Sequence, residues 1–248
     1  MHRFFVSPEQ IRVEERTVTI TGPDVNHIRN VLRMKVGEEL DVADGQGGRE
    51  YRCAVRGYGE DFVDCELRFI REEGVELPSR IHLFQGLPKA DKMELIIQKA
   101  VELGVYRILP VETRRCVVKL DDKKAKSKTA RWQQISESAA KQSRRGIIPE
   151  VTQPLNFQKA LELTEGMDLK LIPYELAEGM EKTRQLLESV RPGQDIAVFI
   201  GPEGGFDEEE IRAATEKGIE PITLGKRILR TETAPLAVLS WLMYRLEP

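Results

Sequence analysis

The feature that most constrains the fold of this chain is a glycine turn in its last quarter, between a fully apolar run and an acidic helix start. Residues 196–200 are typical of a buried strand, residues 201–206 (Gly-Pro-Glu-Gly-Gly-Phe) of a tight turn, and residues 207–217 of a helix. An apolar run followed by such a turn and helix indicates a parallel strand covered on both faces. Open α/β sheets bind small molecules at loops of this kind, at the carboxyl ends of the strands.

The same alternation of strand and helix runs through the chain from residue 81 onward. The further candidates are strand 81–85, helix 93–101, strand 107–111, helix 123–145, helix 156–163, strand 169–173, helix 180–190, strand 222–224 and helix 234–246. This order predicts an α/β fold with a mainly parallel sheet. Residues 1–72 instead hold short strand candidates separated by glycine turns, which predicts a small β-barrel. We therefore expect two domains, 1–72 and 81–248, joined by a linker at 73–80.

Composition narrows the class of protein. No apolar run approaches the ~20 residues of a membrane span, and the N-terminus lacks the apolar core of a signal peptide. The chain has three cysteines without C-x-x-C spacing and three scattered histidines, so the sequence predicts neither a metal site nor a Ser-His-Asp triad. We expect a reduced, cytoplasmic protein without membrane association.

Charge is distributed unevenly along the chain. Residues 89–145 contain 15 Lys and Arg against 7 Asp and Glu, a net charge of +8, whereas residues 146–220 contain 7 against 16, a net charge of −9. A basic segment within a protein of net charge −3 indicates a local footprint for a polyanion such as RNA. The alternative is a solvated helix face, which charge alone does not distinguish.

The turn at 201–206 favours a ligand without phosphate groups. Asp207 and Glu210 have the spacing of a capping box at the following helix. Three consecutive glutamates, 208–210, fill the first helical turn and would repel a phosphate there. The segment matches neither the dinucleotide fingerprint nor the P-loop pattern. An ordinary strand-to-helix turn is the alternative.

A second loop, 224–234, brings three cations, Lys226, Arg227 and Arg230, beside the apolar pair Ile228-Leu229. An exposed connection seldom carries such a pair unless it packs on something. Thr233 is the expected N-cap of the last helix, with Pro235 near its first position. That helix is apolar on almost every side, so we expect it to be buried or to form a subunit interface. A third strand end, at 171–175, could supply further backbone groups to the same crevice.

These motifs resemble the trefoil-knotted (SPOUT) RNA methyltransferases, and among them the 16S ribosomal RNA uridine N3-methyltransferase family (RsmE). The resemblance rests on 201–206 and 224–234 and extends along the chain. It also includes Arg-Phe-Phe-Val at 3–6, His27, Val31-Leu32-Arg33, Gly37, Asp44-Gly45 and the basic helices at 92–105 and 137–145. Two departures are Lys141, where an acidic residue is expected, and Arg144-Arg145, where Gly-Arg is usual.

The resemblance implies a PUA-like RNA-binding barrel at the N-terminus, a deep knot in the C-terminal domain and a homodimer. It also implies that S-adenosylmethionine binds in the crevice and that the partner is 16S ribosomal RNA or the small ribosomal subunit. The expected cofactor-binding residues are Leu171, Ile172, Pro173, Ile200, Gly201, Pro202, Glu203, Gly204, Gly205, Leu224, Gly225, Ile228, Leu229, Arg230, Thr231, Thr233 and Ala234. The expected RNA-binding residues are Arg3, Arg29, Arg33, Lys89, Lys92, Gln142, Arg144 and Arg145.

Uridine N3 carries a proton, and its loss places charge on the two carbonyl oxygens of the base. A fixed cation would stabilise that charge, so we expect Arg230 in this role, with Arg227 second. Glu232 or Glu203 could accept the proton, although an unperturbed carboxylate is a weak base. The alternatives are a non-catalytic RNA-binding or ribosome-assembly module, a SPOUT methyltransferase acting on another RNA position, and a Rossmann-type methyltransferase. The last is disfavoured because the best glycine loop does not follow the first strand.

Overall fold

The computed structural model describes residues 1–46, 48–72, 74–177 and 179–247, and the chain separates into two compact units. The first comprises Met1–Glu76 with Ala140–Ile148, and the second comprises Leu77–Ala139 with Pro149–Pro248. The segment Ala140–Ile148 thus joins the first unit, which local patterns did not indicate. The division at 1–72, 73–80 and 81–248 stays a prediction, and Glu73, at the start of the expected linker, lies outside the described residues.

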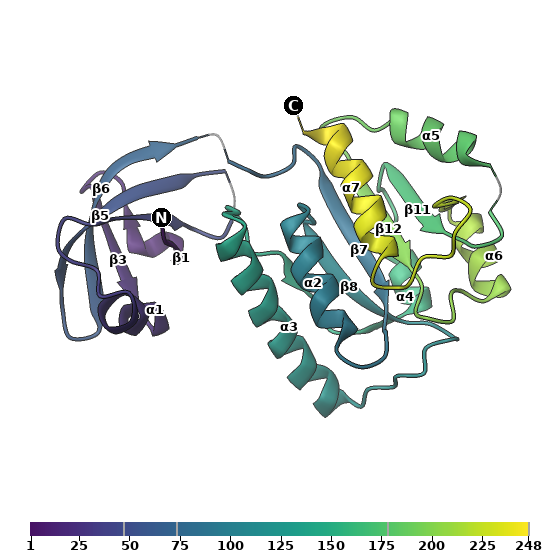
Figure 1. Cartoon of the computed structure of the whole chain (residues 1–248), viewed down its shortest axis with the longest axis horizontal. Helices are drawn as coiled ribbons and strands as arrows, with labels where there is room; N and C mark the ends of the chain where they lie inside the picture. Colours follow the sequence, from purple (N-terminus) through teal and green to yellow (C-terminus); the bar gives the residue numbers. More distant parts are fainter. Residues whose placement is uncertain (47, 73, 178, 248) are drawn as a thin grey trace. The chain divides into compact units, whose positions relative to one another are not determined.

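The first unit is a six-stranded sheet that curls around its own apolar core (Figure 1). Its strand order is β1-β4-β5-β6-β3-β2, with β1 parallel to β4 and the other pairs antiparallel. Alternating residues of these strands, such as Val18, Leu40 and Cys65, fill the core. The elements are β1 (Arg3–Phe5), η1 (Pro8–Gln10), β2 (Ile11–Arg12), β3 (Thr17–Thr21), α1 (Pro23–Asn26), η2 (His27–Val31), β4 (Glu39–Ala43), β5 (Glu50–Tyr58) and β6 (Phe62–Arg71).

Two buried arginines attach Ala140–Ile148 to this unit. The guanidinium of Arg3 donates to the carbonyls of Arg144 and Arg145, the latter at 2.7 Å, and pairs with Glu50 at 2.8 Å. The guanidinium of Arg145 pairs with the carboxylate of Glu76, which also accepts the backbone N–H of Gly146 at 2.8 Å. Because these charges are paired and hydrogen-bonded inside the unit, they hold Ala140–Ile148 against the rest of it.

The second unit is built on a parallel sheet in the order β10-β8-β7-β12-β11-β13, with β9 also paired to β8. Every recorded pair in it is parallel, which confirms the predicted α/β class. The strands are β7 (Arg80–Gly86), β8 (Arg107–Glu112), β9 (Glu150–Val151), β10 (Leu155–Asn156), β11 (Leu169–Pro173), β12 (Asp195–Ile200) and β13 (Glu220–Ile222). The strand expected at 222–224 thus ends at Ile222, which leaves Leu224 in the loop.

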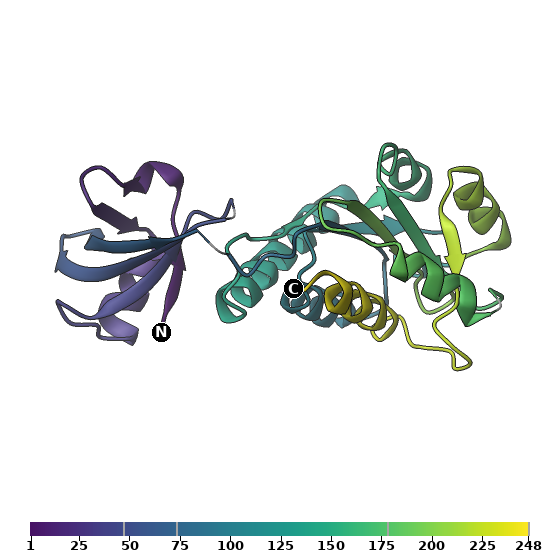
Figure 2. The ribbon, with the colours of Figure 1, turned by 90° about the horizontal axis from the view of Figure 1, so that it is seen from above.

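Helices cover both faces of this sheet (Figure 2). Helices α2, α5 and α7 lie on one face, and α4 and α6 lie on the other, over a core that includes the stacked rings of Phe84 and Phe199, 4.4 Å apart. The helices are α2 (Lys92–Glu102), α3 (Asp122–Gln142), α4 (Phe157–Glu162), α5 (Met180–Glu188), α6 (Glu208–Glu216) and α7 (Ala234–Leu246). Among the described residues, none of the helices has the length and apolar character needed to cross a membrane.

Candidate active site

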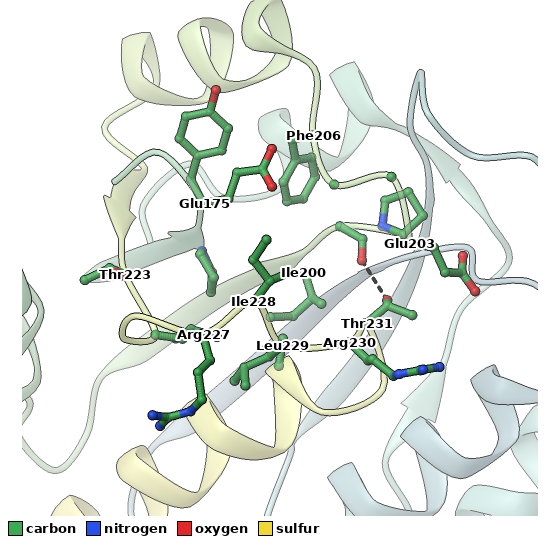
Figure 3. Close-up of a pocket in the computed structure, with 18 of the residues that line it drawn as sticks. Glu175, Ile200, Glu203, Phe206, Thr223, Arg227, Ile228, Leu229, Arg230 and Thr231 are labelled. Carbon is green, nitrogen blue, oxygen red and sulfur yellow. Dashed lines mark hydrogen bonds between the residues drawn. The ribbon is translucent and has the colours of Figure 1, made fainter. Parts of the chain in front are cut away.

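A cavity of about 460 Å³ opens at the carboxyl ends of β11, β12 and β13 (Figure 3). This volume lies within the range of small-molecule sites in proteins. The cavity is formed by the three loops that follow these strands, together with the start of α2. Its walls are made by Lys92, Pro173, Tyr174, Glu175, Ile200, Gly201, Pro202, Glu203, Gly204, Gly205, Phe206, Thr223, Leu224, Gly225, Lys226, Arg227, Ile228, Leu229, Arg230, Thr231 and Ala234.

The glycine loop needs its glycines because backbones approach closely there. A Cβ atom on Gly201 would lie 3.0 Å from the backbone of Gly205, and Gly205 itself has a left-handed φ of 66°. A Cβ atom on Gly86, at the end of β7, would lie 2.6 Å from the ring of Pro202. Side chains at these positions would push the loop away from the neighbouring strand end. The loop therefore presents backbone groups to the cavity.

The far end of the glycine loop is held by the start of α6. Asp207 and Glu210 form the predicted capping box, in which the Glu210 carboxylate accepts the Asp207 N–H at 2.9 Å. The other oxygen of this buried carboxylate accepts the backbone N–H of Arg114 at 2.8 Å. The guanidinium of Arg115 donates to the Gly204 carbonyl at 3.0 Å. The segment after β8 thus supports the loop, although it does not line the cavity.

Thr231 connects the second loop to both neighbouring strand ends. Its buried hydroxyl donates to the Gly201 carbonyl at 2.7 Å, the bond drawn in Figure 3, and accepts from the side-chain amide of Gln85 at 3.1 Å. Gln85 is fully buried at the end of β7. This neutral network joins the ends of β7 and β12 to the last loop of the chain. Gln85 was missed by sequence reasoning because nothing in its local pattern separates it from an ordinary strand residue.

Lys92 lies between carboxylates from both main loops. Its ammonium is 3.0 Å from Glu203 Oε1 and 3.2 Å from Glu232 Oε2. The hydrogen bond to Glu203 is the main reason why the pKa of Lys92 rises above its ordinary value. Burial alone would raise the pKa of Glu203, but hydrogen bonds from its own backbone N–H and from Lys92 outweigh burial and lower that pKa. All three charges in this cluster are therefore paired.

Arg227 and Arg230 are exposed at the edge of the cavity. In Figure 3 their guanidinium groups point to opposite sides of the loop. Within the part of the chain that the structure describes, neither group forms an ion pair with a carboxylate. Both cations are therefore available to an anionic or polar ligand at the cavity mouth.

Most of the expected cofactor-binding residues come together here, and three do not. Leu171 and Ile172 are fully buried in β11, and Ile172 belongs to the core around Phe199. Both faces of a parallel sheet are covered by helices, so mid-strand side chains enter the core and only the strand-end residue Pro173 reaches the cavity. Thr233 is exposed away from the cavity. It occupies the N-cap position, but its side chain makes no capping bond because its backbone is already helical, in a turn that starts at Arg230.

Five further wall residues were not assigned to a site from the sequence, although most of them belong to the predicted loops and strand ends. Tyr174 and Glu175 follow β11, Phe206 ends the glycine loop, and Thr223 and Lys226 flank Leu224-Gly225. Their positions after predicted strands were the available signal. The assignment of the other expected residues to cofactor binding stays a prediction.

Known proteins share both units of this chain. Residues 75–243, which contain the whole cavity, match the model of an RNA methyltransferase domain, and residues 20–68 match that of an RNA methyltransferase PUA domain. Over its full length the chain is 39% identical to the ribosomal RNA small subunit methyltransferase E of Bacillus subtilis, covering 98% of that protein. The chain belongs to the ribosomal RNA small subunit methyltransferase E family.

Two solved structures of similar proteins hold S-adenosylmethionine. One is a ribosomal RNA small subunit methyltransferase E from Neisseria gonorrhoeae, with 35% identity and a TM-score of 0.82 over 97% of this chain and 95% of that one. The other is a methyltransferase from Legionella pneumophila, with 34% identity and a TM-score of 0.83 over 98% of this chain and 96% of that one. These similarities confirm the predicted family.

The RNA-binding residues expected in the first unit of this methyltransferase differ in their accessibility. Arg3 and Arg145 are only 8% and 4% exposed, and their guanidinium groups are already paired inside the unit. These two arginines are therefore structural, because a phosphate could reach neither without breaking buried ion pairs. Arg29 lies 5.2 Å over the Tyr58 ring and donates to nearby carbonyls.

Four of the remaining candidates for RNA contact are exposed, and Lys92 is not. Arg33 and Arg144 have left-handed backbones, with φ of 54° and 61°, and Gln142 is exposed at the end of α3. In the second unit, the side chain of Lys89 is exposed, whereas Lys92 lines the cavity in the ion-paired cluster described above. Because the Lys92 ammonium already pairs with two carboxylates, it is not available for the expected contact with an RNA phosphate.

Proposed function

We propose that this protein transfers a methyl group from S-adenosylmethionine to N3 of a uridine in 16S, the small-subunit ribosomal RNA. The observation that supports this proposal best is the cavity built from three strand-end loops. It lies in a chain that resembles, over 97% of its length, a small-subunit rRNA methyltransferase solved with S-adenosylmethionine. The uridine and its N3 atom come from the resemblance of the two loop motifs to the uridine N3-methyltransferases.

The cavity suits this cofactor. Ile200, Leu224 and Leu229 provide apolar surface for an adenine ring, and the glycine loop exposes backbone groups to its polar edge. Glu175 adds negative charge, which favours a ligand with a sulfonium and an ammonium group. Glutamates 208–210 fill the first turn of α6 and disfavour a phosphate. When bound, S-adenosylmethionine supplies an electrophilic methyl group.

The residues of this chain have to bring the uridine close to that group and stabilise charge on the base. N3 lies on the pairing edge, so the base must be unpaired to enter the cavity mouth. Arg230 is exposed there, pairs with no carboxylate among the described residues, and can donate to the uracil carbonyls as N3 loses its proton. Arg227, on the other side of the loop, is the second candidate. Alignment of the reacting atoms supplies much of the remaining acceleration.

The proton acceptor is not assigned to either carboxylate expected from the sequence. Glu232 was a candidate from the sequence, but its carboxylate is paired with Lys92 and does not line the cavity. Glu203 has a pKa below its ordinary value, which makes it a weaker base still. Glu175, which also lines the cavity, and hydroxide from solvent are the acceptors of the N3 proton that remain.

RNA contacts are proposed for the accessible candidates, namely Arg29, Arg33, Lys89, Gln142 and Arg144. The family match to a PUA domain in the first unit and the net charge of +8 over residues 89–145 support this proposal. The natural partner is 16S ribosomal RNA or the small ribosomal subunit, which places the protein in the cytoplasm.

A homodimer and a C-terminal knot are further parts of this proposal. Helix α7 buries Val238, Leu239 and Leu242 in its own unit, yet Tyr244 is 81% exposed and Trp241 is half-buried. A second copy could cover these aromatic side chains. The knot is supported by the family resemblance.

Nucleoside mass spectrometry tests the function. Small subunits from a strain that lacks the endogenous enzyme are incubated with the protein and isotopically labelled S-adenosylmethionine. Labelled N3-methyluridine at one position is the expected product. Label in a different nucleoside would identify a methyltransferase for another RNA position. Tight RNA binding with no incorporation from subunits or naked RNA would identify a non-catalytic RNA-binding module.

A further inference from the structure

Lys92 links three segments that are distant in the sequence. It is the first residue of α2, Glu203 belongs to the glycine loop, and Glu232 belongs to the last loop. The side chains of the three residues are 28%, 29% and 20% exposed, so solvent screens the cluster only partly. We call these three residues the loop clamp. It joins the two main walls of the cavity at its rim.

The clamp leaves Glu232 dependent on Lys92. Atom Oε2 of Glu232 is buried and makes no hydrogen bond that satisfies normal geometry among the described residues, and the ammonium of Lys92 is the charge beside it. Leaving a buried anionic oxygen without a counter-charge costs free energy. Removing the charge of Lys92 would therefore drive Glu232, and the loop that carries it, out of this position.

Glu203 also holds the turn that precedes α2. Its two carboxylate oxygens accept the backbone N–H of Lys89 at 3.1 and 3.3 Å, in addition to the ammonium of Lys92. The next residue, Ala90, has a left-handed φ of 55°, an unfavourable conformation for a residue with a Cβ atom. Such strain persists only where surrounding contacts enforce it. The carboxylate of Glu203 thus attaches the glycine loop both to this turn and to the first residue of α2.

We propose that Lys92 is a positioning residue whose paired ammonium holds the two cavity loops in the arrangement that binds ligand. In this arrangement Glu203 and Glu232 anchor Lys92 and do not accept the substrate proton. The buried bonds of Thr231 with Gln85 and Gly201 join the same loops beneath, and the clamp sets their separation at the rim. The identity of the ligand rests on the proposed function, whereas the role of the clamp rests on the contacts above.

The test compares Lys92→Met, which removes the charge, with Lys92→Arg, which keeps it. The control is Lys99→Met on the same helix, where Lys99 pairs with Glu102 at 2.8 Å away from the cavity. Calorimetry with S-adenosylhomocysteine measures affinity without RNA, and thermal unfolding checks that each variant is folded. Lys92→Met should weaken affinity about tenfold, as expected if the competent loop arrangement falls to about a tenth of the population. Lys92→Arg should recover most of this loss, and Lys99→Met should bind like the parent protein.

A double-mutant cycle with Glu232→Gln gives a readout that general destabilisation would not move. Within the clamp, the two losses of affinity should be clearly less than additive. Unchanged binding in folded Lys92→Met, an equal loss in Lys99→Met, or full additivity with Glu232→Gln would overturn the clamp. If Lys92→Met weakens only RNA binding and lowers its salt dependence, Lys92 is a phosphate contact and the proposal fails. If the parent protein itself does not bind S-adenosylhomocysteine, the proposed function fails instead.

Discussion

The cationic side chains around the cavity differ in whether a carboxylate of the protein already pairs with them. Lys92 is held by two carboxylates, whereas Arg227 and Arg230 are exposed on the last loop. A side chain without a partner in the protein can respond to charge that develops on a substrate, because no existing ion pair has to be broken. This difference separates residues that shape the site from residues that can act on the base.

Arg230→Ala should lower the rate of methyl transfer with little change in cofactor affinity. If Arg230 stabilises charge on the uracil carbonyls, single-turnover rates at saturating RNA and cofactor should fall by about 10²–10³, as for other charge-stabilising donors. In the matched variant Arg227→Ala, the single-turnover rate should fall less. Equal losses of cofactor affinity, thermal stability and rate in Arg230→Ala would show that the residue only shapes the loop.

Arg144→Gly should make the protein more stable while it weakens RNA binding. Glycine adopts the left-handed φ of 61° without strain, and the carbonyl that accepts from Arg3 is retained, so unfolding should require about 1 kcal/mol more. Loss of one phosphate contact should lower the slope of log affinity against log salt by about 0.7–0.9.

Arg16→Gly is the control, because Arg16 is also left-handed, at 53°, but donates its guanidinium to carbonyls of β6. Its RNA affinity and salt slope should match those of the parent protein. An unchanged salt slope in Arg144→Gly would place Arg144 outside the RNA interface.

Helix α7 of the second unit buries some of its apolar side chains and exposes others. Helix α7 packs against α2, α5 and β12, and six of its residues are buried. A helix apolar on almost every side was expected to be buried or to lie in an interface. The single chain buries one side of α7 and exposes Tyr244 on the other, so this element combines both roles in our proposal.

Tyr244→Glu should convert the proposed homodimer into a folded monomer. A charge on the exposed side of α7 would be desolvated in a subunit interface, whereas in the monomer it stays in water. Light scattering coupled to size-exclusion chromatography measures the mass. Phe62→Glu, an exposed aromatic residue of the first unit, is the control and should keep the parental mass. A dimer that persists in Tyr244→Glu and in Trp241→Glu would show that α7 lies outside the interface.

For the molecule as a whole, stability depends on titratable groups far from the cavity as well as on the site. His82 and Asp195 pair at 3.3 Å on adjacent strands, β7 and β12, at the end of the sheet opposite the loops. Burial lowers the pKa of His82, although hydrogen bonding to Asp195 opposes this effect. Folding therefore disfavours the protonated imidazole, whereas the unfolded chain protonates His82 near the ordinary pKa of 6.5.

The free energy of unfolding should consequently fall as pH drops below 6.5. In that range the unfolded chain binds a proton that the folded chain resists, which gives a slope of at most about 1.4 kcal/mol per pH unit from this group. Urea unfolding at pH 7.5 and 5.5 measures the change, and His82→Gln should reduce it. The pKa of Asp195 is lowered, because the hydrogen bonds that it accepts from Arg80 and His82 outweigh burial. The contribution of Asp195 to stability is therefore lost only as the pH falls below about 3.8, the ordinary pKa of an aspartate. An equal change in both proteins would exclude His82 as the cause.

The sequence by itself determined the class of fold, most elements and the cavity loops. Strand 169–173 and helix 234–246 lie where their patterns predicted, and the glycine turn lies at a strand end beside the last loop. These features follow from the period of apolar residues and the backbone freedom of glycine, which are local properties of the chain.

Only the tertiary structure decided which side chains meet. It buried Leu171 and Ile172 in the core, used Arg3 and Arg145 in internal ion pairs, and placed Lys92 in the cavity wall. Local pattern cannot show this, because the burial and the charge of a residue's neighbours depend on segments 100 or more residues away, as with Lys92 and Glu203. A cation has the same local signature whether it binds a phosphate or a carboxylate of its own chain, and only the fold decides which of them it meets.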